Sequence, residues 1–65
     1  PQEITVPFDL ACWFARWFAM DVRQWQYVIE RDGVFTTGDG ADLDWCYPGW
    51  KVIAAFDPEG RHYDE

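Results

Sequence analysis

The sequence contains no serine and no asparagine, and its only histidine is His62. Without serine, a Ser-His-Asp triad is excluded. The two cysteines, Cys12 and Cys46, allow a Cys-His pair with His62, but the three residues match no spacing of a closed zinc site, which takes three or four Cys and His ligands. We therefore expect no enzyme, no metal site and no cofactor.

Cysteine is also too sparse for the framework of a disulfide-rich secreted domain. Cys12 and Cys46 either form one bridge or remain thiols, and two buried thiols are the favoured expectation. No basic and apolar leader precedes residue 11. The apolar stretch 11–20 is shorter than the ~20 residues of a membrane-spanning helix, and Arg16 interrupts it. We expect a soluble protein, located in the cytoplasm.

Basic side chains are few, since five Lys and Arg are outnumbered by twelve Asp and Glu, which gives a net charge of -7. This charge argues against direct binding to nucleic acid and to anionic membranes, because both require a basic surface. It favours a basic partner instead, such as the groove in which another protein holds DNA or RNA. The alternative is that the charge only keeps an aromatic-rich chain soluble.

Aromatic residues are abundant, at 20% of the 65 residues, and we interpret the chain as one domain, 1–65. A domain this small buries little surface, so large rings are one way to stabilise it. No Gly, Pro or β-branched residue occurs from Leu10 to Met20, which predicts an aromatic-rich helix over about residues 9–20 with Asp9 as its N-cap. Helical spacing predicts a stripe that covers the inner face of a sheet, made of Leu10, Trp13, Phe14, Trp17 and Phe18.

Two segments of the first half of the chain have the pattern of strands. Residues 3–8 alternate between apolar and other residues, and Pro7 makes this an edge or ending strand. Residues 22–31 fit either a second helix or a strand. The strand is slightly favoured, because Asp32-Gly33 can form a two-residue hairpin turn into residues 34–37.

The second half of the chain contains a polar loop and two turns. Residues 38–44 are the predicted loop, and Pro48-Gly49 fits the centre of a type II turn that would join strands at 43–47 and 50–56. Residues 57–60 form a further turn, which precedes a short edge strand. The predicted fold class is α+β, with one helix packed on a small antiparallel sheet that runs as a β-meander.

Three aspartates crowd the 38–44 segment, where a calcium site is the alternative to a solvated acidic loop. Ala41 and Leu43, however, occupy positions at which an EF-hand needs oxygen ligands. We expect the carboxylates at the strand ends to form an acidic surface that takes the place of phosphates on a basic protein. The predicted residues of this partner-binding surface are Asp39, Asp42, Asp44, Asp57, Glu59, Asp64 and Glu65.

A small acidic chain with many aromatic residues and no catalytic set resembles the phage-encoded inhibitors of host nucleic-acid machinery, among them the anti-CRISPR proteins. A local likeness to phage inhibitors of bacterial RNA polymerase lies in Val6-Pro7, Trp25-Gln26-Tyr27 and Pro48-Gly49. The resemblance implies a non-enzymatic DNA mimic and no specific contact residues.

The partner implied by this resemblance is a basic nucleic-acid-binding protein or a CRISPR surveillance complex, bound by a monomer or a small homo-oligomer. The alternative function belongs to a different class. It is a protein–protein interaction or assembly module that binds through exposed aromatic residues, because Trp and Tyr are common interface anchors.

Overall fold

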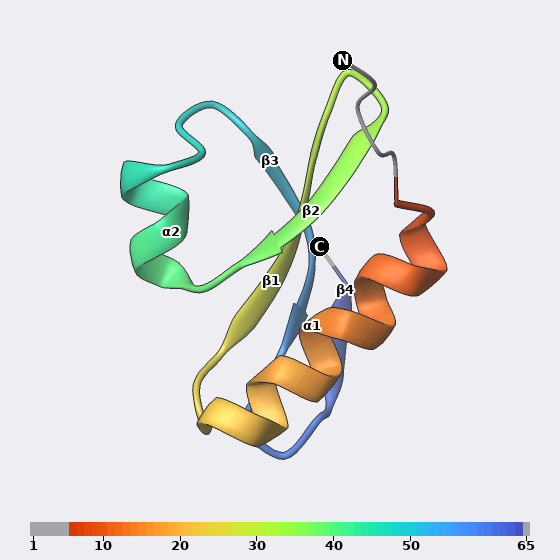
Figure 1. Ribbon diagram of the computed structural model, residues 1–65, viewed down its shortest axis with the longest axis vertical. Helices are drawn as coiled ribbons and strands as arrows, with labels where there is room; N and C mark the ends of the chain where they lie inside the picture. Colours follow the sequence, from red (N-terminus) through yellow and green to blue (C-terminus); the bar gives the residue numbers. More distant parts are fainter. Residues whose placement is uncertain (1–5, 65) are drawn as a thin grey trace.

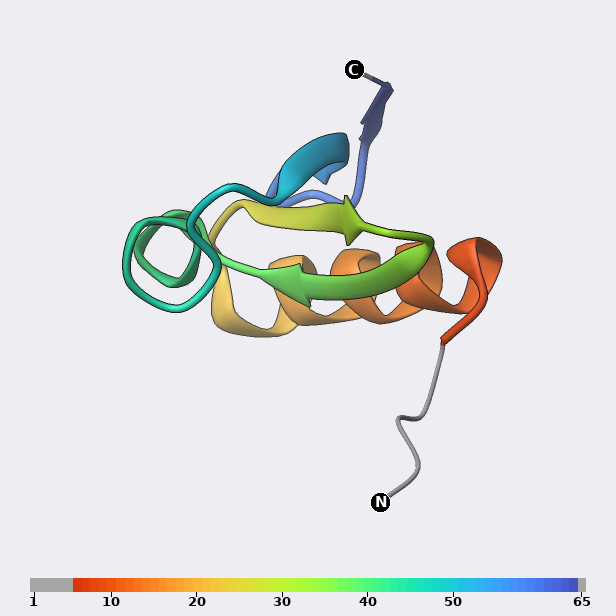
Figure 2. The same ribbon diagram turned by 90° about the horizontal axis from the view of Figure 1, so that it is seen from above.

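The computed structural model describes residues 6–64, which form two helices and four strands (Figure 1). In chain order the elements are α1 (Phe8–Val22), β1 (Gln26–Arg31), β2 (Val34–Gly38), α2 (Gly40–Trp45), β3 (Lys51–Phe56) and β4 (His62–Asp64). The strands form one antiparallel sheet with the order β2-β1-β3-β4. α1 runs along one face of this sheet, as Figure 2 shows. The predicted α+β fold is confirmed.

The first helix, α1, begins one residue before its predicted start and ends two residues after its predicted end. At its start the Pro7 carbonyl accepts a hydrogen bond from the Ala11 N–H, and no side chain caps the helix. The prediction that Asp9 is the N-cap is therefore wrong, and Asp9 lies in the first turn, where the helix dipole favours its charge. At the other end, the left-handed backbone of Arg23 lets its N–H donate to the Ala19 carbonyl.

The side of α1 that packs on the sheet is made of alanine. Ala11, Ala15 and Ala19 recur every four residues and are buried, and they form the core together with Val28, Ala54 and Phe56 of the sheet. Such small side chains let the helix approach the sheet closely. The prediction that the large aromatic stripe covers the sheet is wrong, because the alanine stripe on the opposite side of the helix does so.

This orientation explains why α1 continues past its predicted end. An inward aromatic stripe would bury Asp21, and a buried unpaired carboxylate is costly. With alanine facing the sheet, Asp21 is exposed and the helix extends to Val22. The strand interpretation of 22–31 is confirmed for β1, which follows after three residues.

The hairpin between β1 and β2 has the predicted two-residue turn. Asp32 and Gly33 have φ values of 52° and 81°, which is the left-handed conformation that a type I′ turn requires at both positions. Arg31 therefore pairs with Val34 on the neighbouring strand. The two turn residues alone determine this hairpin, which is why it could be predicted from the sequence.

Two predicted strands are absent from the part of the chain that is described. Of the expected strand at 3–8, residues 3–5 lie outside the described residues, Val6 and Pro7 are not in a strand, and Phe8 belongs to α1. The expected strand at 43–47 is also wrong, because most of it lies in α2.

Both predicted turns of the second half are present. Gly49 has a φ of 84° and the Trp50 N–H donates to the Tyr47 carbonyl, as in a type II turn. This turn leads into β3, which pairs with β1 instead of the segment before the turn, so the sheet is not a simple meander. The turn at residues 57–60 lies between β3 and β4, and β4 is the predicted edge strand.

Candidate interaction surfaces

Two of the predicted acidic residues form the start of α2. The Asp39 carboxylate accepts a hydrogen bond from the Asp42 N–H at 2.9 Å, and the Asp42 carboxylate accepts one from the Asp39 N–H at 3.2 Å. This capping box satisfies two backbone amides at the helix start, which is why the predicted loop at 38–44 is mostly helical. Asp44 lies exposed on the same helix. Among residues 6–64, no group of three or more Cys, His, Asp and Glu is arranged to hold a metal ion.

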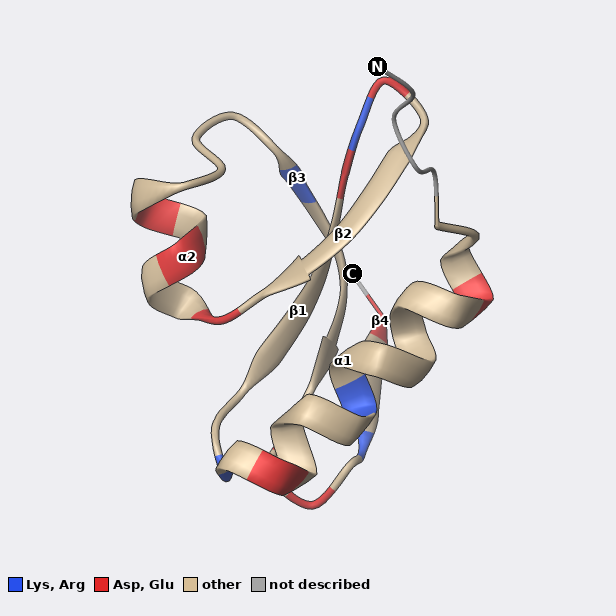
Figure 3. Ribbon diagram, in the orientation of Figure 1, with Lys and Arg blue, Asp and Glu red and all other residues tan. Residues whose placement is uncertain are grey.

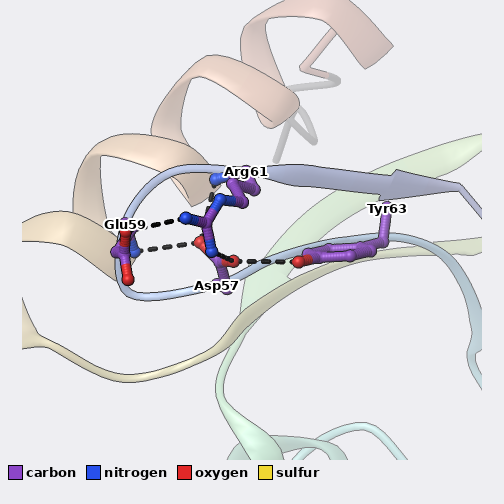
Figure 4. Close-up of polar contacts among 4 residues, drawn as sticks. All are labelled: Asp57, Glu59, Arg61 and Tyr63. Carbon is purple, nitrogen blue, oxygen red and sulfur yellow. Dashed lines mark hydrogen bonds and ion pairs between the residues drawn. The ribbon is translucent and has the colours of Figure 1, made fainter.

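Asp57 is buried, with only 5% of its surface exposed, in the turn between β3 and β4 (Figure 4). Its Oδ1 accepts hydrogen bonds from the N–H groups of Glu59 and Arg61, both at 2.9 Å, and its Oδ2 accepts one from the Tyr63 hydroxyl at 3.0 Å. The Arg61 guanidinium lies 3.5 Å from the same carboxylate. Burial raises the pKa of Asp57, but the hydrogen bonds and the charge of Arg61 outweigh burial and hold this pKa below its usual value.

The other described acidic residues near the C-terminus, Glu59 and Asp64, each lie beside a nitrogen-bearing side chain at the surface. Glu59 pairs with Arg61 at 3.0 Å, and Asp64 lies 2.9 Å from the His62 ring nitrogen. Glu65 lies outside the described residues. Figure 3 shows that the acidic positions of α2 and those of the β3–β4 turn lie in different parts of the molecule. The structure therefore forms two small acidic groups and does not bring them together.

Most of the exposed large apolar side chains lie on α1. We call six of them the outer face of α1, namely Leu10, Trp13, Phe14, Trp17, Phe18 and Met20, of which Phe14 and Phe18 lie beside β2. The exposed fraction is 59% for Trp13 and 53% for Trp17. Sequence reasoning missed this surface because α1 is apolar on nearly all sides, so its periodicity does not indicate which side packs inward. The available signal was the four-residue spacing of the alanines.

The aromatic rings of the outer face contact one another. Trp13 meets Phe14 edge to face with centroids 5.3 Å apart, and Trp17 meets Phe18 in the same way at 5.7 Å. Phe14 and Phe18 are stacked at 6.3 Å, which links the two pairs. These contacts restrict the rings before a partner binds, and that lowers the entropy cost of binding. A hollow of about 260 Å³ between α1 and β2 extends the apolar surface beside Phe14 and Phe18.

Cys12 and His62 line one shallow hollow of about 250 Å³ beside α1. Burial raises the pKa of the Cys12 thiol, and the charges of Asp9 and Asp64 raise it further. A cysteine nucleophile needs a lowered pKa, so this pair lacks the usual activation. Both cysteines are free, but Cys46 is exposed at the end of α2, so the expectation of two buried thiols is wrong.

No protein-family model, no curated protein and no solved structure matches this chain. In the part of the chain that the structure describes, no helix is both long enough and apolar enough to cross a membrane. The roles of the two kinds of surface are therefore inferred from their chemistry.

Proposed function

We propose that this chain is a non-enzymatic protein–protein interaction module that binds through the outer face of α1. The observation that carries the proposal is the orientation of the helix, in which alanines pack on the sheet while Trp13, Trp17 and their large neighbours are exposed. Monomeric proteins rarely leave a contiguous apolar surface of this kind uncovered. Tryptophan side chains at interface centres often supply a large part of the binding energy.

The net charge favours a protein over a lipid surface as the occupant of this face. Amphipathic helices that lie on membranes usually have Lys and Arg on their polar side, which attract anionic lipids. In this chain the net charge is -7, and it opposes approach to an anionic membrane. A protein surface with its own apolar patch meets no such barrier.

Photo-crosslinking in the cells that produce the chain tests this proposal. A photoreactive phenylalanine analogue in place of Trp17 should yield crosslinked protein, whereas the same analogue in place of Trp45 should not. Trp45 is a matched control because it is 83% exposed and lies on α2, away from the outer face of α1. Crosslinks at both positions, or at neither, would contradict the proposed surface.

A second candidate is the acidic inhibitor that occupies the nucleic-acid site of a basic protein, such as a CRISPR surveillance complex. It is favoured by residues 32–50, which contain four aspartates and no Lys, Arg or His. Replacing Asp39, Asp42 and Asp44 together by Asn removes charge but keeps side chains that cap helices well. Binding to such a complex should then be lost, and unchanged binding would exclude this candidate.

A further inference from the structure

The small core of the domain favours a permanent occupant for the outer face of α1. In residues 6–64 the buried apolar side chains are four alanines, Val28, Ile29 and Phe56. Both cysteines are free, so no disulfide supplements this core. Chains of this size usually need disulfides, a metal, unusually dense packing or oligomerisation to be stable. Burial of the outer face whenever the chain folds would supply what the core lacks.

We propose that the outer face of α1 binds the same face of a second copy of this chain, in a two-fold symmetric dimer. The inference rests on the proposed function and names its partner. A second copy is present wherever the chain is made, which suits an interface that contributes to folding. A two-fold interface uses one self-complementary surface on both subunits, so no second apolar surface is required.

The size of the outer face fits such a dimer. Its four aromatic side chains are 37–59% exposed. Because an aromatic side chain buries ~150 to 250 Å², these rings together with Leu10 and Met20 offer on the order of 500 Å² per subunit. Two copies would bury about 1,000 Å² in total, which is the lower bound for a biological interface.

The charge around the outer face favours a second copy over a basic partner. Residues 8–23 contain two acidic side chains, Asp9 and Asp21, and two basic ones, Arg16 and Arg23. This segment is neutral, and the ten acidic and three basic side chains elsewhere account for the whole net charge of -7. A basic partner would therefore find no excess of carboxylates on α1, and the segment as a whole adds no net charge repulsion between two copies.

An antiparallel arrangement of the two α1 helices also matches their ends. It places Asp9, at the start of one helix, toward Arg23 at the end of the other. It also pairs the positive end of each helix dipole with the negative end of its neighbour. Trp13 and Trp17 then lie near the two-fold axis, at the centre of the contact, where aromatic anchors are most effective.

Sedimentation equilibrium of the purified full chain tests the dimer. The wild type should sediment at twice its mass of 7.7 kDa. Trp17→Glu places a charge at the interface twice per dimer, and we expect it to raise the dimer dissociation constant at least about thirty-fold. Leu10→Glu is a second test, since an acidic residue in the first turn favours the helix and is less disruptive to folding. Trp45→Glu is the matched control and should remain dimeric.

The outcomes separate the dimer from the broader proposal. Monomeric Trp17→Glu or Leu10→Glu with a wild-type circular dichroism spectrum, beside a dimeric Trp45→Glu, supports the α1 dimer. A monomeric or larger wild-type species, or a dimer that survives both α1 substitutions, overturns it. If the wild type is monomeric but position 17 crosslinks to another protein, only the dimer fails. If it is monomeric and position 17 gives no crosslink, the interaction function fails as well.

Discussion

The aspartates of this chain differ in how many hydrogen bonds their carboxylates accept. Asp57 accepts three hydrogen bonds in its turn, Asp39 and Asp42 each accept one at the start of α2, and Asp44 is exposed. The residue type could not predict this difference, because it depends on where the folded backbone directs its N–H groups. The sequence predicted all four as acidic surface. Asp57 is instead buried in its turn, and the role of the other three in binding a partner stays a prediction.

Replacing Asp57 by Asn is expected to lower the free energy of unfolding at neutral pH, because the neutral amide loses the pairing with Arg61 and accepts fewer hydrogen bonds. In the folded chain the pKa of Asp57 lies below its usual value of 3.8. Its stabilising contribution is therefore complete above that pH and is lost as the pH falls through the lower, folded pKa. Urea unfolding at neutral pH and below about pH 4 should show the difference between wild type and Asp57→Asn shrinking in acid.

The control for this measurement is Glu59→Gln. Glu59 pairs with Arg61 at the surface, and exposed ion pairs contribute only about 0 to 1 kcal/mol. The control should therefore unfold almost as the wild type does. A difference between wild type and Asp57→Asn that stays constant from neutral to acidic pH would contradict the role given to this carboxylate.

Among the elements, α1 was predicted correctly as a helix and wrongly in its orientation. Its existence follows from local propensity, because no Gly or Pro interrupts it. Its orientation depends on the sheet, where Val28, Ala54 and Phe56 pack against alanine. A helix that is apolar all round gives no sequence signal for this choice. The outer face of α1 therefore emerged only from the packed structure.

The second helix, α2, was missed although its capping signal is present in the sequence. Asp39 and Asp42 have the spacing of a capping box, and the intervening Gly40 and Ala41 fit a helix start. The density of Asp and Gly in the segment favoured a loop instead. A search for reciprocal caps three residues apart would have found the helix.

Replacing Asp39 by Ala tests this explanation of α2. The variant loses the N-cap and should destabilise the protein by about 1 kcal/mol in chemical unfolding. Asp44→Ala is the control, since Asp44 lies exposed on the same helix and outside the capping box; its effect should stay within about 0.5 kcal/mol. Equal losses of stability in the two variants would mean that the capping box does not hold α2.

At the scale of the whole molecule, the topology depended on contacts between distant segments. The hairpin turns at Asp32-Gly33 and at 57–60 were predictable because each is encoded within a few residues. The position of β3 beside β1 joins segments more than twenty residues apart, and no local pattern specifies that pairing. The class of the fold could thus be predicted, but the order of its strands could not.

The charges and the apolar surface occupy different parts of the molecule. The segment that contains α1 is neutral and bears four exposed aromatic rings, whereas the net negative charge lies in the rest of the chain (Figure 3). On the proposed function, the outer face of α1 binds another protein while the acidic remainder favours the solubility of the assembly. We expect the outer face of α1 to be covered in the working protein.

Hydroxyl-radical labelling of tryptophan, read by mass spectrometry, measures whether the outer face of α1 is covered. It is applied to the purified chain over a range of concentrations and to an extract of the cells that produce it. We expect Trp13 and Trp17 to become protected in the concentrated chain and in the extract, while Trp45 stays reactive. If Trp13 and Trp17 are labelled under every condition as strongly as their exposure in the isolated chain predicts, the outer face of α1 is not covered and the account is contradicted.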